Sequence, residues 1–365
     1  MALLEVTDLT VSFPTVDGVV KAVRGVSFSL DAGRTLGIVG ESGSGKTVLT
    51  QTLLGLTPGA DISGSVVFEG NDLLRISEDD MRNVRGARIA VIFQDSLTSL
   101  HPLYTVGWQI AEMIRAHETS VSKKEAGERA VDLLRRVGIP RPETRVNDYP
   151  HQFSGGMRQR AMIAMALSLS PQIVIADEPT TALDATVQAQ ILDLLVRLRH
   201  ESGTALIMIT HDLGVVADIA DDVMVMYAGR AAEKAAKRDV FYNPHHPYTM
   251  GLLESIPSSS AVGDRLRPIP GSPPSLINLP SGCKFHPRCG YVLDRCVTEE
   301  PPLRPLGLDA YHSSACWLPA KAAGLSEQAA ELRAQTVREG RGEAAAEVFE
   351  AEVAGAFGID GSVTG

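Results

Sequence analysis

The sequence contains no long apolar run, and this limits how the chain can meet a membrane. Its most apolar segments, 161–169 and 173–176, are far shorter than the roughly 20 residues that a helix needs to cross a bilayer. Glu5 and Asp8 stand where a secretion signal would need basic residues followed by an uninterrupted apolar run. We therefore expect the chain to stay in the compartment where it is made and to reach a membrane only through partner proteins.

Basic residues are not in excess either. The 34 lysines and arginines are outnumbered by 44 aspartates and glutamates, which gives a net charge of −10. The chain as a whole therefore does not attract nucleic acid or anionic lipid, and we expect no nucleic-acid partner. Hydrophobic residues make up 44% of the chain, enough for a sizeable core, and the length of 365 residues favours two domains of unequal size.

Strand-like and helix-like segments alternate along most of the chain. Short β-branched runs separated by turn residues predict strands at 4–11, 19–23, 26–30 and 35–39. Apolar residues at helical spacing predict a helical insertion over 106–137. A helix at 185–199 then lies among strand-like runs at 173–176, 205–209 and 223–227. This alternation is typical of a mostly parallel α/β sheet.

The glycine-rich segment after strand 35–39 has the P-loop pattern. It reads Gly40-Glu41-Ser42-Gly43-Ser44-Gly45-Lys46-Thr47 and precedes a helical run at 48–54, the context that the motif requires. The glycines let backbone N–H groups turn inward around phosphate oxygens at a helix N-terminus. Lys46 would neutralise the β- and γ-phosphates, and Thr47 would offer its hydroxyl to Mg²⁺.

Two carboxylates end the apolar strand at 173–176. Asp177 and Glu178 would lie at the carboxyl edge of the sheet, close to the P-loop. We expect Asp177 to hold Mg²⁺ and Glu178 to polarise the attacking water as a general base.

Three further features carry little weight singly. Ser154-Gly155-Gly156 begins a helix predicted to run to Ser170, with Ser154 as N-cap and Pro171 ending it. Gln94 follows a strand at 89–93, and His211 follows the strand at 205–209. Alone, each is more readily explained as a cap, a turn residue or a structural histidine.

Their order along the chain resembles that of the ATP-binding cassette (ABC) ATPases. The order is P-loop, Gln94, Ser154-Gly155-Gly156, Asp177-Glu178, Ala182-Leu183-Asp184 and His211, within residues 3–235. The resemblance implies an α/β fold, a P-loop ABC ATPase cassette with a RecA-like core, an antiparallel β subdomain and a helical subdomain over about 95–170. It also implies that ATP and Mg²⁺ are bound.

The resemblance assigns further roles. Ser154, Gly155 and Gly156 would form the signature motif, which closes over the γ-phosphate of ATP held by a facing subunit. Gln94 would sense the nucleotide and contact its Mg²⁺, Asp184 would lie at the dimer seam, and His211 would contact the γ-phosphate. Phe13 is the candidate to stack on adenine, with Val20 and Val23 as alternatives.

Several longer segments are similar to the oligopeptide/dipeptide importer subfamily. They read Phe-Gln-Asp-Ser-Leu-Thr-Ser-Leu-His-Pro at 93–102, Phe-Ser-Gly-Gly-Met-Arg-Gln-Arg at 153–160, Asn-Pro-His-His-Pro-Tyr-Thr at 243–249 and Leu-Leu-Glu-Ser-Ile-Pro at 252–257. Phe153 and Met157 depart from the commonest ABC signature, but both are acceptable in one of the two ATPases of this subfamily. With the cysteine segment included, the resemblance extends to about residue 318.

This resemblance implies an ATPase subunit on the cytoplasmic face of the cell membrane that couples ATP hydrolysis to peptide import. Its partners would be a second ABC ATPase, more often a different chain than a second copy, two membrane permease subunits and an extracytoplasmic solute-binding protein. The permeases would dock in the groove between the helical insertion and the Gln94 loop. Nickel chelates and glutathione-like solutes remain alternative cargoes.

Other classes fit the sequence less well. A soluble ABC ATPase would carry two cassettes or a long coiled coil, and a P-loop GTPase would carry an Asn-Lys-x-Asp motif; the sequence has neither. An inert ATPase core is disfavoured because Lys46, Asp177, Glu178 and His211 are all present.

Prolines become frequent from Pro244 onward, so we expect a loop-rich module over 236–319 after a cassette over 1–235, and a flexible Ala/Glu-rich tail over 320–365. All four cysteines of the chain lie in this module, spaced C-x5-C-x6-C-x19-C: Cys283, Cys289, Cys296 and Cys316. They are too few for a disulfide scaffold. Their spacing alone leaves an iron–sulfur cluster, Zn²⁺ and buried thiols open. The segment 282–289 is similar to that of subfamily members with a [4Fe-4S] cluster, and this resemblance favours the cluster in a structural or regulatory role.

Overall fold

The computed structural model describes residues 2–94, 99–181, 183–255, 269–306 and 309–318. Parts of several expected motifs lie outside these residues. They are 95–98 in the segment after Gln94, Ala182 before Asp184, the Ile256-Pro257 end of the subfamily segment, and the tail over 320–365.

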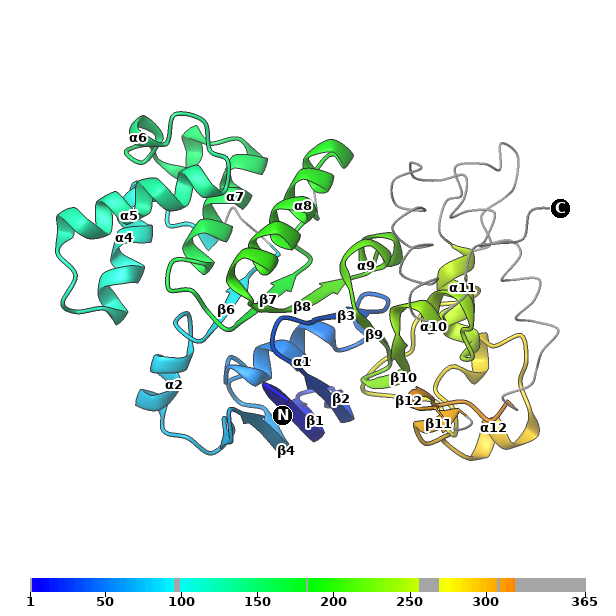
Figure 1. Cartoon of the computed structure of the whole chain (residues 1–365). Coiled ribbons are helices and arrows are strands. Elements are labelled where there is room, and N and C mark those ends of the chain that lie inside the picture. The colour runs from blue at the N-terminus through cyan, green and yellow to red at the C-terminus, as the bar shows by residue number, and fades with distance from the viewer. Residues whose placement is uncertain (1, 95–98, 182, 256–268, 307–308, 319–365) are drawn as a thin grey trace, which may run out of the picture.

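An eight-stranded sheet forms the centre of the molecule (Figure 1), in the order β11-β12-β10-β9-β3-β8-β7-β6. The neighbours among five of its strands pair in parallel. These five strands are β3 (Thr35–Val39), β6 (Ile89–Ile92), β7 (Ile173–Asp177), β8 (Ala205–Thr210) and β9 (Asp222–Tyr227). Every residue of β3, β7 and β8 is buried, as expected for parallel strands covered on both faces. The helices α1 (Lys46–Leu53), α8 (Ala185–Ser202) and α9 (Leu213–Ile219) follow β3, β7 and β8, which confirms the predicted α/β class.

A second sheet is antiparallel, in the order β2-β1-β4-β5. Its strands are β1 (Leu4–Thr15), β2 (Gly18–Leu30), β4 (Asp61–Phe68) and β5 (Asn71–Asp72). The two strands predicted at 19–23 and 26–30 are in fact one strand, β2. Gly25 has φ +77, and the pairing with β1 shifts register opposite it. This is a β-bulge, so the break in the sequence pattern marks an irregularity inside a strand and not its end.

Helices form a separate layer beside β6 and β7 (Figure 1). They are α4 (Val106–His117), α5 (Lys123–Arg136), α6 (Pro142–Arg145), η1 (Pro150–Gln152) and α7 (Gly155–Ala166), with α2 (Glu78–Val84) preceding β6. Thr105 caps α4 and Ser122 caps α5, each accepting a hydrogen bond from a backbone N–H three residues on. The helical insertion is therefore confirmed. However, α7 ends at Ala166 and not at Ser170, since Ser170 precedes Pro171 and has φ +52.

The elements from β10 onward share a hydrophobic core with the strands that precede them. The elements are β10 (Arg230–Ala236), α10 (Lys237–Tyr242), α11 (Pro247–Glu254), η2 (His286–Arg288), α12 (Asp294–Thr298), β11 (Arg304–Leu306) and β12 (Asp309–Ser314). Strand β12 pairs with β10 and so extends the central sheet. Tyr248 and Phe285 pack in one cluster with Val225 and Tyr227 of β9. The predicted loop-rich module is thus fixed to the edge of the cassette.

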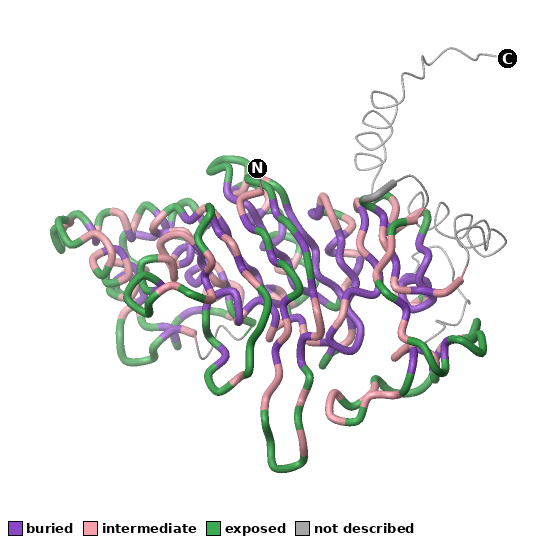
Figure 2. The backbone as a smooth tube through the Cα atoms, turned by 90° about the horizontal axis from the view of Figure 1, so that it is seen from below, coloured by how far each residue is buried: buried purple, intermediate pink, exposed green. Residues whose placement is uncertain are grey.

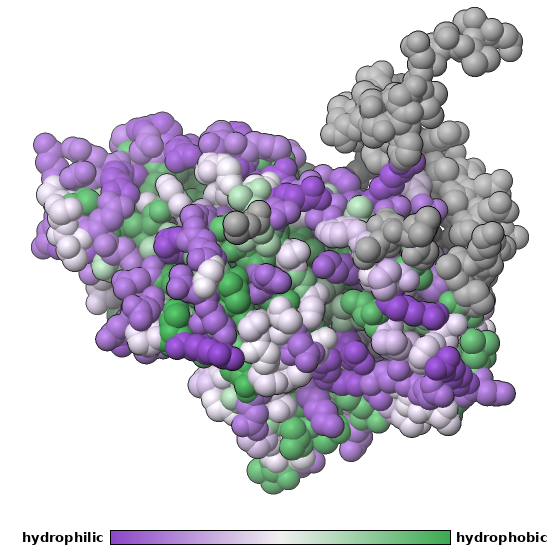
Figure 3. Space-filling view, turned by 60° about the horizontal axis from the view of Figure 1, so that its bottom comes forward, coloured by the Kyte–Doolittle hydropathy of each residue, from purple (hydrophilic) through white to green (hydrophobic). Residues whose placement is uncertain are grey.

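Buried backbone is concentrated in the strands of the interior, and the outer loops are exposed (Figure 2). On the face shown in Figure 3, hydrophilic residues predominate and hydrophobic ones form scattered patches. Among the residues that the structure describes, no helix has the length and apolarity needed to span a membrane.

Candidate nucleotide-binding site

The P-loop connects β3 to α1 and is pressed against neighbouring backbone. A Cβ atom on Gly40 would lie 2.3 Å from the carbonyl oxygen of Met226, and one on Gly45 would lie 2.2 Å from that of Ala22. Both positions also have positive φ, +154 and +99, so glycine is required there for space and for conformation. A Cβ on Gly43 would meet nothing within 4 Å. The sequence pattern thus forms the tight loop that phosphate binding needs.

Lys46 bends back over the loop that precedes it. Its Nζ donates hydrogen bonds to the carbonyl oxygens of Gly40 at 2.7 Å and Glu41 at 2.9 Å. Burial lowers the pKa of Lys46, and the carboxylates of Glu178 and Asp177 oppose this shift. The ammonium group is therefore held at the P-loop by backbone carbonyls, in reach of the carboxylate pair.

Asp177 lies where predicted, at the end of β7 beside the P-loop. Its Oδ1 accepts a hydrogen bond of 3.3 Å from the hydroxyl of Thr47. Burial raises the pKa of the Asp177 carboxyl, while the Thr47 hydrogen bond and Lys46 oppose the shift. A hydroxyl and a carboxylate are hard oxygen donors, which suit Mg²⁺.

Glu178 is the point at which three predicted site residues meet. Its Oε2 accepts a hydrogen bond of 3.0 Å from the amide of Gln94, and its Oε1 lies 3.3 Å from Nδ1 of His211. Thr181 donates to the same carboxylate at 2.9 Å. Glu178 also has φ +45, an uncommon conformation for a residue other than glycine, of the kind that clusters at functional sites.

The signature residues and Asp184 lie together at two helix starts. The hydroxyl of Ser154 accepts a hydrogen bond of 3.3 Å from the Met157 N–H at the start of α7, and Asp184 accepts one of 3.0 Å from Val187 at the start of α8. A Cβ on Gly156 would lie 2.8 Å from Val187, so the two helix starts are in contact. Ser154 and Asp184 are both exposed, and no hydrogen bond among the described residues joins either to the P-loop.

Phe13 is half-buried on β1 and packs against the core beneath the antiparallel sheet. Its cross-strand neighbour on β2 is Val20, also half-buried. Val23 is only 2% exposed, so of the three candidates for stacking on adenine it is the least accessible.

The four cysteines surround one small cavity in the module after the cassette. Cys283, Cys289, Cys296 and Cys316 line it together with residues that include His246 and Trp317. All four are free thiols. Burial raises the pKa of Cys283 and Cys289, and raises that of Cys316 to about 12. Within the described part of the chain, no three histidine, cysteine or acidic side chains are arranged as a ready metal-binding group.

The contacts of Glu41 could not be predicted from the sequence, in which this residue is only a P-loop position. The Glu41 carboxylate pairs with Arg288, and the Glu41 N–H donates a hydrogen bond of 2.8 Å to the hydroxyl of Tyr248. Both partners are more than two hundred positions away, and no spacing in the sequence indicates them.

The fold and this site define a P-loop ATPase of the ABC type. Residues 23–181 match the family model described as ABC transporter, and residues 232–296 match the one described as oligopeptide/dipeptide transporter, C-terminal region. Two solved cassettes are similar in fold. A dimeric bacterial ABC transporter cassette, MJ0796, has a TM-score of 0.58 at 27% identity and covers 64% of this chain and 99% of its own. The cassette cbiO1 from Clostridium perfringens has a TM-score of 0.57 at 28% identity and covers 66% and 91%.

Curated relatives are similar over most of the chain. The oligopeptide transport ATP-binding protein OppD of Bacillus subtilis is 54% identical over 82% of this chain and 85% of its own length. The dipeptide transport ATP-binding protein DppD of Lactococcus lactis is 50% identical over 87% and 90%, and OppD of Escherichia coli is 52% identical over 83% and 89%. The chain belongs to the oligopeptide/dipeptide branch of the ABC transporter ATP-binding proteins. It is accordingly an ATP hydrolase that uses ATP with Mg²⁺.

Proposed function

We propose that this chain is the subunit that couples ATP hydrolysis to the import of dipeptides or oligopeptides. The observation that carries the proposal is the similarity over more than four fifths of the chain to proteins named for oligopeptide and dipeptide transport. The match of 232–296 to the C-terminal region of such transporters supports the same cargo class.

In the proposed mechanism, Thr47 and Asp177 would hold Mg²⁺, which would offset charge on the phosphates of ATP. Glu178 takes a proton from water while the water oxygen attacks the γ-phosphorus and the bond to the ADP oxygen breaks. The contacts of Gln94 and His211 with the Glu178 carboxylate, at 3.0 and 3.3 Å, support a role for both in orienting it. Lys46 would move from backbone carbonyls to phosphate oxygens when ATP binds.

Ser154, Gly155, Gly156 and Asp184 would act on ATP held by a facing subunit. Ser154 and Asp184 are exposed, and their hydrogen bonds are to their own helix starts. The similar cassette MJ0796 is described as a dimer. We infer that the facing subunit is a related but different ATPase chain; a second copy of this chain would give the same geometry.

The membrane permeases would dock where the helical layer meets the Gln94 loop. Exposed apolar side chains support this site. Phe93, directly before Gln94, is 41% exposed, and Leu103 is 76% exposed. Trp108 on α4 is 46% exposed and stacks on Tyr104 with ring centroids 4.1 Å apart. This arrangement would place the chain on the inner surface of the membrane through two permeases, with cargo delivered by an extracytoplasmic solute-binding protein.

The four-cysteine cavity is proposed to hold a [4Fe-4S] cluster, with Zn²⁺ as the alternative. Four thiols around one cavity fit the donor set of either group. Burial raises the pKa of the Cys283, Cys289 and Cys316 thiols, so loading must release protons, since thiolates are the ligands. The division into a cassette over 1–235, with a helical subdomain over about 95–170, and a module over 236–319 is likewise proposed.

The function is tested by transport in proteoliposomes that contain the complete complex. ATP-dependent uptake of a labelled dipeptide and a labelled pentapeptide is compared with uptake of a nickel chelate and of glutathione. We expect peptide uptake that disappears when Lys46 is replaced by Ala. Uptake of the chelate or of glutathione without peptide uptake would contradict the cargo class, and ATP hydrolysis without any uptake would contradict the coupling.

A further inference from the structure

One arginine of the cysteine segment reaches into the P-loop. Arg288 lies in η2, between Cys283 and Cys289, and its two Nη atoms bind the two carboxylate oxygens of Glu41 at 2.6 and 2.9 Å. Its Nε donates to the carbonyl of Pro270 at 2.8 Å, and the side chain is only 5% exposed. A bidentate, nearly buried arginine–carboxylate pair is among the strongest and most directional polar contacts in proteins.

The main chain of Glu41 is fixed on both sides as well. Its N–H donates to the hydroxyl of Tyr248, which is fully buried, and its carbonyl accepts from Lys46. Tyr248 packs against Tyr227, whose hydroxyl accepts a hydrogen bond of 3.3 Å from Arg288. The start of the P-loop is therefore held by one connected group of side chains from β9, α11 and η2.

Because Glu41 is negatively charged, its pairing with Arg288 should affect how the P-loop binds ATP. Glu41 stands between Gly40 and Ser42, inside the loop that must receive several negative phosphate oxygens. An unpaired carboxylate there would repel them in a partly buried site, where such repulsion is poorly screened. The guanidinium of Arg288 neutralises the negative charge of Glu41, and its two hydrogen bonds hold the Glu41 carboxylate in one orientation.

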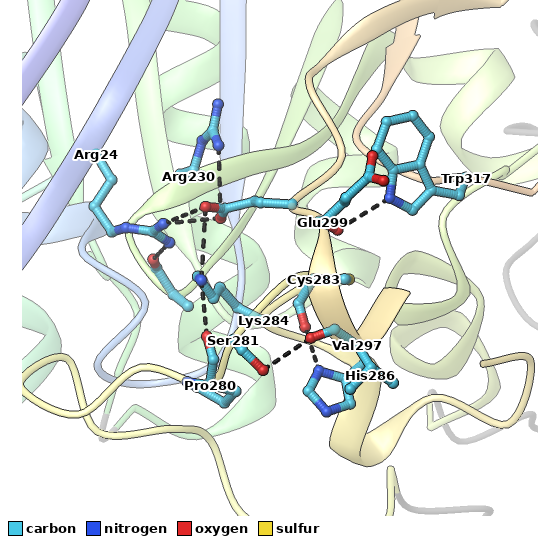
Figure 4. A network of polar contacts seen from close by, with 12 residues as sticks. Arg24, Arg230, Pro280, Ser281, Cys283, Lys284, His286, Val297, Glu299 and Trp317 are labelled. Atoms are coloured by element: carbon cyan, nitrogen blue, oxygen red, sulfur yellow. Dashed lines mark hydrogen bonds and ion pairs between the residues drawn. The ribbon is translucent and has the colours of Figure 1, made fainter. Parts of the chain in front are cut away.

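The same module also contacts Arg24 of β2, which lies near Lys284 in Figure 4. Glu300 accepts from Arg24 at 2.7 and 2.8 Å and lies 3.6 Å from Nζ of Lys284. Arg24 also binds the carbonyls of Ala228 and, through its N–H, Gly229. The Gly229 N–H in turn donates to the carbonyl of Ser44 at 3.0 Å. The module thus contacts the P-loop directly at Glu41 and reaches Ser44 indirectly, through Arg24 and Gly229.

We propose that Arg288 is a positioning residue of the ATP site, which shapes the P-loop through Glu41 and neutralises it, so that the cysteine segment influences ATP affinity. The inference rests on the ATPase function and not on the identity of the cargo or of any group that the cysteines hold. A chain that binds ATP as expected here but imports no peptide would overturn the proposed function alone.

The test is a double-mutant cycle on ATP binding by the full chain with Mg²⁺, measured by displacement of a fluorescent ATP analogue. Arg288→Gln should raise the Kd at least about tenfold, because it leaves the half-buried Glu41 carboxylate unpaired beside the phosphates. Glu41→Gln should raise it less, and adding Arg288→Gln to Glu41→Gln should bring little further loss. An unchanged Kd for Arg288→Gln would overturn the proposal. So would a double variant in which Arg288→Gln costs as much as it does alone, since a purely structural role would persist without the carboxylate.

Arg295→Gln is the matched control. Arg295 pairs with Glu299 in the same module, its side chain is 53% exposed, and within the described part of the chain it makes no hydrogen bond to the P-loop. Its Kd should equal that of the unaltered chain.

Arg288→Lys keeps the charge and loses the bidentate geometry, so it serves if Arg288→Gln fails to fold. We expect an intermediate Kd for Arg288→Lys, and an unchanged Kd would overturn the geometric role. Cys283→Ser should raise the Kd more in the unaltered background than in Glu41→Gln, and equal effects would overturn the link to the cysteine segment.

Discussion

The amide of Gln94 donates a hydrogen bond of 3.0 Å to the carboxylate of Glu178. The two residues follow β6 and β7, which pair in parallel with Ile92 opposite Ala176. Strand pairing therefore brings them to the same edge, and the amide and the imidazole of His211 occupy both carboxylate oxygens. A water molecule or a γ-phosphate that enters this position meets a carboxylate already oriented by two neighbours.

The first prediction concerns Glu178. Glu178→Gln keeps the size of the side chain and removes the base, so ATP hydrolysis should fall at least about a hundredfold while ATP binding stays nearly intact. Dimers that retain ATP should accumulate. Phosphate release by the complete complex measures the loss, with Glu201→Gln, at the exposed end of α8, as control. Near-normal turnover would contradict the assignment of Glu178 as base.

A second prediction tests the facing-subunit arrangement. Ser154→Arg should leave ATP binding by the isolated chain unchanged and block ATP-dependent dimer formation, because the added bulk lies at the start of α7 and not at the chain's own P-loop. Size-exclusion chromatography with ATP reports the dimer. Ser122→Arg, at the equally exposed N-cap of α5, should leave the dimer intact. Loss of ATP binding by the isolated Ser154 variant would argue against the arrangement.

Lys46→Ala should weaken ATP binding by roughly ten- to a hundredfold, the effect of removing a charged hydrogen-bond donor from a phosphate site. The variant also loses the bonds that Lys46 makes to Gly40 and Glu41, so thermal unfolding is recorded beside the Kd. Lys124→Ala, an exposed lysine of α5, is the control. Unchanged affinity would remove Lys46 from the phosphate site.

Much of this site is predictable from the sequence because its parts are local. A P-loop between a strand and a helix, and polar residues directly after parallel strands, converge by the rules of α/β topology. The bulge at Gly25 and the early end of α7 depend on pairing and on the residue before Pro171, and the sequence pattern alone gives the wrong boundaries there. The pair of Arg288 and Glu41 depends on how the module packs against β9, and no periodicity or spacing encodes that packing.

The buried carboxylate of Glu233 makes stability depend on pH. It is fully buried on β10 and binds Nε2 of His312 at 2.8 Å and the N–H groups of His245 and His246 at 2.7 and 3.0 Å. Burial would raise the Glu233 pKa, but these hydrogen bonds outweigh it and lower the pKa. Burial also lowers the pKa of His246 from 6.5 to about 4, with His245 adding to the shift and Glu233 opposing it.

The unfolded chain therefore binds a proton on His246 below pH 6.5, and the folded chain does so only near pH 4. Folding stability contributed by this group is present above pH 6.5 and is lost as the pH falls toward 4, and Glu233 shifts stability in the same direction at lower pH. We expect about 2 kcal/mol less stability at pH 5 than at pH 7 from His246, measured by denaturant unfolding. His246→Asn keeps an acceptor for the Tyr248 N–H and should reduce the loss of stability between pH 7 and pH 5. If the variant loses as much stability as the unaltered chain, the assignment to His246 is contradicted.

The last prediction concerns the four cysteines. The thiols line one cavity, and burial raises the pKa of three of them. A metal must displace the protons of these thiols, so loading should improve as the pH rises. Chain purified without oxygen should be brown, absorb broadly in the violet and contain about four irons, as a cubane held by four thiolates requires. Cys296→Ser should reduce the iron content, whereas Ser281→Ala, whose hydroxyl donates to the Val297 carbonyl, should not. Colourless chain with one tightly bound zinc would refute the cluster in favour of Zn²⁺, and folded chain without metal would refute the site, because four thiols in this cavity would then be stable as buried, protonated groups.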